Sequence, residues 1–110
     1  MAELIKDCLP PGVYNCISGD DNASFNVGAF LTDCPKVAKV SFTGSVATGK
    51  RIMSHCADDV KRVTLELGGN DAAIVRSDVN VKEMAPKVFA SAFGNSGQIC
   101  RAIKRCYIST

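Results

Sequence analysis

Segments typical of strands and of helices alternate along most of this chain, and that order limits the folds open to it. β-rich runs are followed by turns and then by stretches with helical periodicity. Repeated strand–helix–strand units build a parallel sheet covered by helices, so we expect an α/β fold. Strands are predicted at 37–42, 62–67 and 105–110, with a short apolar run at 71–75. Helices are predicted at 46–57 and at 79–93, the second capped by Asp78.

The first third of the chain gives shorter segments. A helix over 2–8 is expected to end before Pro10 and Pro11, which cannot continue it. A short buried strand is predicted at 13–17, and a helix at 22–32. The residues of this helix that we expect to face inward are Phe25, Gly28, Ala29 and Leu31.

Composition narrows the class of protein. The 110 residues can form one small domain, and 46% are hydrophobic, which argues against disorder. A net charge of +2, from 13 basic and 11 acidic residues, does not favour nucleic acid or an anionic membrane as partner. The chain has no apolar run of roughly 20 residues and no basic start followed by an apolar stretch. We therefore expect a soluble protein of the cytoplasm.

The chain has six cysteines. A disulfide framework is disfavoured because the cytosol keeps thiols reduced. No two cysteines have C-x2-C spacing and His55 is the only histidine, so we expect no metal site. Most of the cysteines are expected to be small buried apolar residues.

A glycine-rich turn follows the strand predicted at 37–42. Gly44 and Ser45 come just before the helix at 46–57, whose free amides attract anions. Gly44, Gly49 and Lys50 have the spacing of a phosphate-binding loop, but Arg51 stands where that loop needs a Ser or Thr for magnesium. The alternative for this segment is an ordinary turn between a strand and a helix.

Two further motifs hold reactive side chains. Glu66 lies between two leucines and before Gly68 and Gly69, where a carboxylate beside apolar walls can serve as a general base. Its alternative is a solvent-facing strand residue. Cys100 follows a Gly-Gln-x turn and precedes three cationic residues, and positive charge nearby favours the thiolate. Its alternative is an inert buried thiol.

The motifs Phe42-Thr43-Gly44-Ser45, Leu65-Glu66-Leu67-Gly68-Gly69 and Gly97-Gln98-Ile99-Cys100 together resemble the aldehyde dehydrogenase superfamily. The similarity runs from about Leu9 to Ile108 and implies a Rossmann-like strand–helix alternation, a partial version of that family's fold. It implies NAD or NADP as cofactor, with Gly44, Ser45 and Gly49 along its pyrophosphate. Gly28 would lie on the adenine side, and the backbone of Leu67 near the nicotinamide.

The same resemblance implies a reaction. Cys100 would add to an aldehyde and give a thiohemiacetal, hydride would pass to the cofactor, and water activated by Glu66 would release a carboxylic acid. Residues 1–67 would belong to the cofactor domain and residues 68–110 to the start of the catalytic domain.

Because the similarity covers a middle slice of the family's fold, we expect a fragment that lacks activity by itself. A second hypothesis is a non-catalytic chain that associates with itself or with full-length paralogues through open sheet edges. A third is a small thiol-redox protein that uses Cys100, although no C-x2-C pair supports it.

Overall fold

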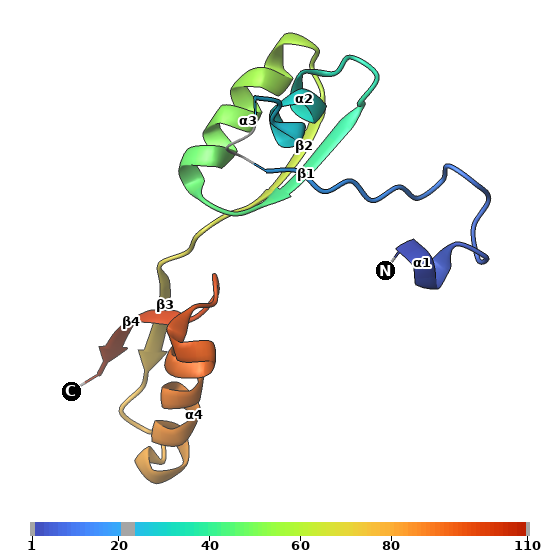
Figure 1. Ribbon diagram of the computed structural model, residues 1–110. Helices are drawn as coiled ribbons and strands as arrows, with labels where there is room; N and C mark the ends of the chain where they lie inside the picture. The colour runs from blue at the N-terminus through green and yellow to red at the C-terminus, as the bar shows by residue number, and fades with distance from the viewer. Residues whose placement is uncertain (1, 21–23, 110) are drawn as a thin grey trace. The chain divides into compact units, whose positions relative to one another are not determined.

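The computed structural model describes residues 2–20 and 24–109 (Figure 1). Its contacts divide the chain into two compact units. One holds the chain up to Val40 and Ile52–Val63, and the other holds Ser41–Arg51 and the chain from Thr64 onward. The elements are α1 (Ala2–Ile5), α2 (Val27–Asp33), β1 (Lys39–Thr43), α3 (Val46–Asp58), β2 (Arg62–Glu66), β3 (Asp71–Val75), α4 (Val81–Phe93), the 3-10 turn η1 (Gly94–Gly97) and β4 (Ile103–Ile108).

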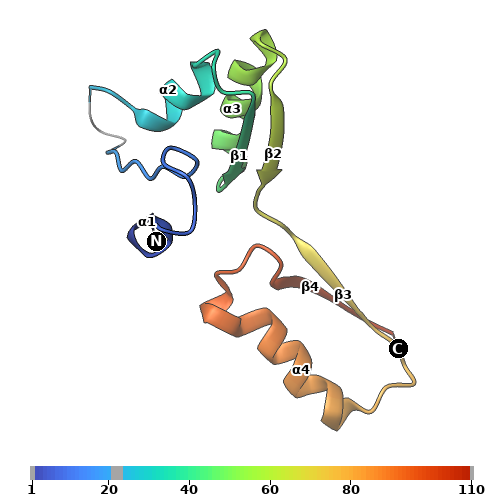
Figure 2. The same ribbon diagram turned by 90° about the vertical axis from the view of Figure 1, so that its right-hand side faces the viewer.

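Strands β1 and β2 form a two-stranded sheet joined by α3. The Arg62 N–H donates to the Ala38 carbonyl oxygen at 3.2 Å, and the Gly44 N–H donates to the Glu66 carbonyl oxygen at 3.0 Å. The first bond joins the starts of the two strands and the second joins their ends. The strands are therefore parallel, as Figure 2 shows. A parallel pair needs a crossover connection, which α3 supplies.

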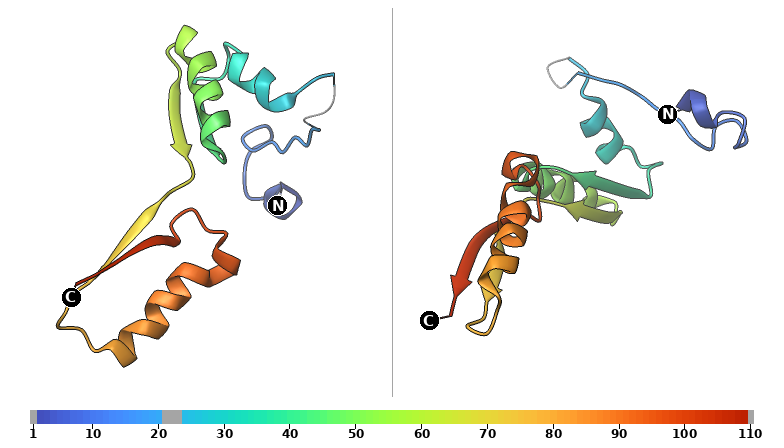
Figure 3. Two further views of the ribbon diagram at one scale, coloured as in Figure 1. Left: turned by 90° about the vertical axis from the view of Figure 1, so that its left-hand side faces the viewer. Right: turned by 90° about the horizontal axis from the view of Figure 1, so that it is seen from below.

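Strands β3 and β4 form a second parallel pair, with Asp71 opposite Ile103 and Val75 opposite Ile108. Helix α4 joins them and lies alongside the pair (Figure 3). The expected α/β fold with parallel strands is confirmed. Strands β1, β2 and β4 and the two long helices also begin and end within about two residues of the predicted bounds, and the apolar run at 71–75 is strand β3. None of the helices within 2–20 and 24–109 is both long and apolar enough to cross a membrane.

Helix α3 ends in a Schellman motif. The Lys61 N–H donates to the Cys56 carbonyl oxygen at 3.0 Å, and the Val60 N–H donates to the Ala57 carbonyl oxygen at 3.1 Å. This places Val60 at the left-handed position, with a φ of 52°, where glycine is usual.

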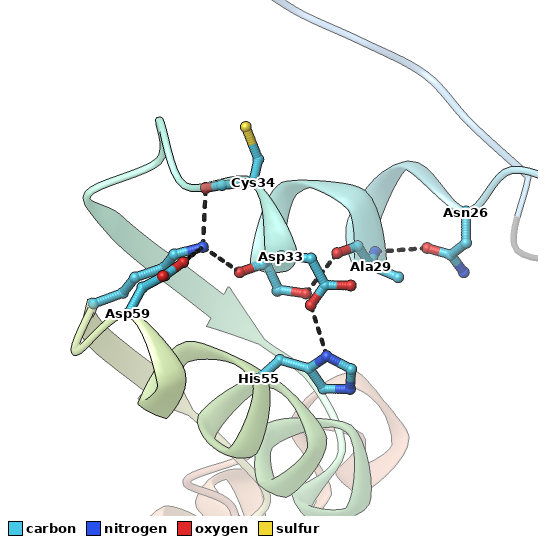
Figure 4. A network of polar contacts seen from close by, with 8 residues as sticks. Asn26, Ala29, Asp33, Cys34, His55 and Asp59 are labelled. Atoms are coloured by element: carbon cyan, nitrogen blue, oxygen red, sulfur yellow. Dashed lines mark hydrogen bonds and ion pairs between the residues drawn. The ribbon is translucent and has the colours of Figure 1, made fainter.

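The end of α2 is anchored by two side chains (Figure 4). The Lys61 ammonium, on a side chain only 2% exposed, donates to the carbonyl oxygens of Thr32 at 2.5 Å and Cys34 at 2.9 Å. His55 of α3 contacts the Asp33 carboxylate at 2.6 Å. A buried ammonium needs such partners, and here it satisfies carbonyls at the end of the helix.

Three local predictions are wrong. Residues 13–17 form no strand and are exposed, because none of the strands found in the described ranges pairs with them. Helix α2 begins at Val27, after the cap Asn26, whose side chain accepts from the Ala29 N–H at 2.8 Å. Residues 21–23 lie outside the described part of the chain. The cap of α4 is Asn80, which accepts from the Lys82 N–H at 3.1 Å, while Asp78 pairs with Arg76.

The expected inward face of α2 is also wrong. Phe25 is 56% exposed and Leu31 41% exposed, and Gly28 and Ala29 are exposed too. Phe25 packs against Phe30, with ring centroids 5.1 Å apart, so the two rings cover each other rather than a core.

Few side chains are buried. In the described ranges the fully buried apolar residues are Cys56 and Ala102. All six thiols are free, Cys34 is half-buried, and four cysteines are exposed: Cys8, Cys16, Cys100 and Cys106. The prediction that most cysteines are buried is therefore wrong, because most segments that bear them have no element packed over them.

Candidate active site

Cys100 follows a strained turn. Asn95 and Ser96 have left-handed backbones, with φ of 51° and 56°, and Gly97 has a φ of 76°. The turn is held by the Gln98 N–H, which donates to the Asn95 carbonyl oxygen at 3.0 Å, and by the Asn95 amide, which donates to the Gln98 carbonyl oxygen at 3.2 Å. Strain of this kind concentrates at functional sites and persists only where neighbouring contacts support it. The thiol is free and the residue is exposed, so Cys100 is not buried as its alternative interpretation expects.

Two cationic side chains of β4 hold the segments that enter the β3–β4 pair. The Lys104 ammonium donates to the carbonyl oxygens of Ile99 at 2.9 Å and Cys100 at 2.7 Å. The Arg105 guanidinium donates to the Asn70 carbonyl oxygen at 2.9 Å. The positive charges expected near Cys100 therefore bind backbone carbonyls of both motifs.

Gly69 lies directly against the backbone of Cys100. A Cβ on Gly69 would stand 2.6 Å from the Cys100 carbonyl oxygen and would also overlap the Asp71 carboxylate. Contacts that close are essentially absent around real Cβ atoms, so any larger residue would force the neighbouring backbone to shift. Gly68, in contrast, has open space around the position of a Cβ. The parallel pairing of β3 with β4 explains the contact, because the segments that enter two parallel strands meet at one edge.

The turn from β1 into α3 contains the predicted phosphate site. The ring of Phe42 covers Gly44, where a Cβ would overlap it. The Ser45 hydroxyl accepts from the Thr48 N–H at 3.1 Å and donates to the Thr48 hydroxyl at 3.0 Å, so it caps α3. The first amides of the helix, those of Val46 and Ala47, have no acceptor within the helix. These free amides are the groups at a helix start that an anion such as pyrophosphate can bind.

Gly49 is buried in α3 and admits a neighbouring side chain. A Cβ there would lie 2.8 Å from a methyl carbon of Leu67. The contact brings Leu67, one residue past β2, against the first turns of α3. Two of the predicted cofactor residues are thus side by side, and packing is the role that their contact shows.

Glu66 is the last residue of β2, and its side chain is exposed while those of Leu65 and Leu67 are half-buried. Its carbonyl oxygen accepts from the Gly44 N–H, which joins the glutamate motif to the glycine-rich turn. Across residues 2–20 and 24–109, its carboxylate has no hydrogen bond, and none joins it to Cys100. Gly28 lies exposed in the first turn of α2, where a Cβ would stand 3.3 Å from the Asn26 side-chain oxygen.

Sequence reasoning identified the cysteine, glutamate and glycine motifs but not the contacts that join them. The sequence placed Lys104 among the cations near Cys100, but it did not reveal that the ammonium binds the carbonyl oxygens of Ile99 and Cys100. The doublet Gly68-Gly69 was a signal for Gly69, although it did not reveal which neighbour needs the space.

Comparison with known proteins supports the motifs. The model of the aldehyde dehydrogenase family matches residues 1–110. A probable aldehyde dehydrogenase of Pseudomonas sp is 51% identical over 108 residues, 98% of this chain and 21% of that protein. The crystal structure of an Escherichia coli NADP-dependent enzyme matches with a TM-score of 0.87 and 44% identity, over 97% of this chain and 22% of its own. An aldehyde dehydrogenase of Bacillus cereus, solved as an NAD+ complex, matches with a TM-score of 0.71 and 40% identity, over 74% of this chain and 16% of its own.

The relatives thus include an NADP-dependent enzyme and an aldehyde dehydrogenase solved with NAD+ bound. The chain spans about a fifth of the length of the relatives that it matches along nearly all of its own length. The family match covers all of the chain, and identity exceeds 40% along nearly all of it. The chain therefore belongs to the aldehyde dehydrogenase family.

Proposed function

We propose that this chain carries the cysteine nucleophile and the glutamate base of an NAD(P)-dependent aldehyde dehydrogenase. The supporting observation is the contact between Gly69 and the backbone of Cys100, which joins the cysteine turn to the glutamate motif. The exposed thiol on a strained, supported turn agrees with a nucleophile.

In this proposal the Cys100 sulfur forms a bond to the carbonyl carbon of an aldehyde, and the carbonyl oxygen takes a proton. Bound NAD or NADP would supply the hydride acceptor that takes the adduct to the thioester. Glu66 then removes a proton from water as the water attacks the thioester carbon. The carbon–sulfur bond breaks, and the products are a carboxylic acid and the Cys100 thiol.

We propose that the cofactor's pyrophosphate lies on Gly44 and the first amides of α3, with Ser45 and Gly49 in the same turn. To bind phosphate, the Ser45 hydroxyl would exchange its bond to Thr48 for one to the ligand. Gly28 would border the adenine side and Leu67 the nicotinamide. The boundary between cofactor and catalytic domains is proposed at Gly68, whose surroundings are open.

We propose that the 110 residues bind an aldehyde and react with it at Cys100, but do not sustain turnover. Catalysis needs preorganised donors around the developing oxyanion, and about four fifths of the Pseudomonas relative's length lies outside the part that this chain matches. We place this chemistry in the cytoplasm, where six free thiols stay reduced.

An ester that acylates thiolates tests the two roles without the cofactor. With p-nitrophenyl acetate, Cys100 should displace p-nitrophenolate and form an acetyl thioester, visible by intact mass and peptide mapping. Glu66→Gln should slow hydrolysis of that thioester by about 100-fold, the usual effect of a general base. Glu83→Gln, a matched change on α4, should leave it unchanged. Acetylation spread evenly over the exposed cysteines, or equal hydrolysis rates, would rule out the assignment.

A second function is favoured by one observation, an apolar groove of about 520 Å3 between α4 and the β3–β4 pair. It exposes Phe89 (65%) and Phe93 (61%), and surfaces of this kind mark interaction sites. We propose that a family member of full length covers it. Sedimentation of the chain mixed with the E. coli relative should show a complex that Phe89→Ser with Phe93→Ser abolishes. Leu4→Ser, at an exposed residue outside the groove, should not affect it.

A further inference from the structure

Lys104 holds the backbone on both sides of the Cys100 α-carbon. Its ammonium donates to the carbonyl oxygen before that carbon, of Ile99 at 2.9 Å, and to the one after it, of Cys100 at 2.7 Å. Both distances lie in the range of strong charge-assisted hydrogen bonds. A surface lysine whose charge is only hydrated by solvent makes no such pair of contacts. Lys87 of α4 is an example, with none in the part of the chain that the structure describes.

This arrangement constrains the backbone that carries the thiol. Each peptide group is planar, so holding two successive carbonyls limits the φ and ψ of the residue between them. The direction of the Cα–Cβ bond follows from that backbone, and rotation about this bond then places the sulfur. The left-handed residues Asn95 and Ser96 put strain into the same turn, and the turn needs outside contacts to keep one conformation.

A second anchor comes from the next residue of β4. Successive side chains of a strand leave opposite faces, and Arg105 reaches the Asn70 carbonyl oxygen while Lys104 reaches the cysteine turn. One cation therefore fastens each segment that enters the β3–β4 pair, and Gly69 meets Cys100 between them.

We infer that Lys104 is a positioning residue for the Cys100 thiol, acting through the two carbonyls that flank its α-carbon. The inference rests on the proposed function, because it gives Lys104 a role toward the nucleophile assigned there.

The test uses the whole chain and two readouts that need neither aldehyde nor cofactor. The first is the rate of alkylation of Cys100 by iodoacetamide, divided by that of Cys8, an exposed thiol in the other unit. The second is hydrogen exchange of the Ala102 amide, which donates to the Ile99 carbonyl oxygen at 3.0 Å within the turn.

Lys104→Met should lower the alkylation ratio and speed Ala102 exchange, each by about tenfold, because two hydrogen bonds to a charged group are lost. Lys104→Arg should restore both within about twofold, since guanidinium can donate to two carbonyls. Lys87→Met removes an equivalent charge from α4 and should change neither. Where Lys104→Met unfolds, seen as loss of protection throughout the chain, Lys104→Gln replaces it with the same expected directions.

Unchanged readouts in the methionine or glutamine variant would overturn the inference. An arginine variant as impaired as the methionine variant would overturn it too, because the role would then lie in lysine packing. Failure of the proposed function looks different. It would show as absent acylation of Cys100 by the ester in the unaltered chain, whatever the alkylation ratio.

Discussion

At the scale of single residues, the site depends on glycines, which have no side chain. The motif before Cys100 could be recognised from the sequence, and so could Glu66. The sequence could not reveal that Gly69 and Cys100 touch, because this contact depends on the register of β3 against β4. Asn95 and Ser96 each hold a left-handed backbone, which costs about 1–3 kcal/mol of conformational free energy. The sequence suggests this conformation only weakly.

Gly69→Ala should therefore destabilise the β3–β4 pair by about 1–3 kcal/mol, since the new methyl group would overlap backbone that cannot move freely. The measurement is the free energy of local opening from hydrogen exchange of β3 and β4 amides. Gly68→Ala is the control, expected within about 0.5 kcal/mol because its Cβ meets open space. Equal effects at the two glycines would refute the close approach.

At the scale of elements, the ends of helices are decided by contacts that sequence patterns describe only loosely. The helical periodicity of 46–57 located α3, but the residue in the left-handed position after it is a β-branched valine. Val60 is 87% exposed, so its side chain gains little from packing.

Val60→Gly should stabilise α3 by about 1 kcal/mol, because glycine adopts the left-handed backbone without the Cβ clash. Thermal unfolding followed by circular dichroism should show a higher midpoint. The same change at Val81, the first residue of α4, should lower it, since glycine disfavours helix. A lower midpoint for Val60→Gly would contradict the Schellman geometry.

The cap of α4 offers a second comparison at this scale. Asp and Asn cap helices about equally well, so the sequence did not distinguish Asp78 from Asn80, two residues apart. Asn80→Ala should cost about 1 kcal/mol of helix stability through loss of the bond to the Lys82 N–H. Asp78→Ala removes only an exposed ion pair with Arg76 and should cost at most about 0.5 kcal/mol. The measurement is hydrogen exchange of the amides in the first turn of α4. Faster exchange in Asp78→Ala than in Asn80→Ala would contradict the assignment of Asn80 as the cap.

At the scale of the whole molecule, the order of strands and helices from 37 to 108 was predictable because alternation and β-branched runs are local signals. The elements in the first third of the chain were less predictable. Residues 13–17 have the composition of a strand, but a strand forms only beside a partner, and Val13 and Ile17 are 63% and 68% exposed. Apolar residues elsewhere are likewise left open, which the proposed association with a full-length relative would explain.

We propose Cys100 as the nucleophile of a site that responds to the cofactor. The most direct measurement is intact-mass labelling of the chain by a thiol-reactive aldehyde analogue, with and without NAD, followed by peptide mapping. We expect fast labelling at Cys100 that NAD alters and Cys100→Ser abolishes. Slow and equal labelling of the four exposed cysteines, indifferent to NAD, would contradict it.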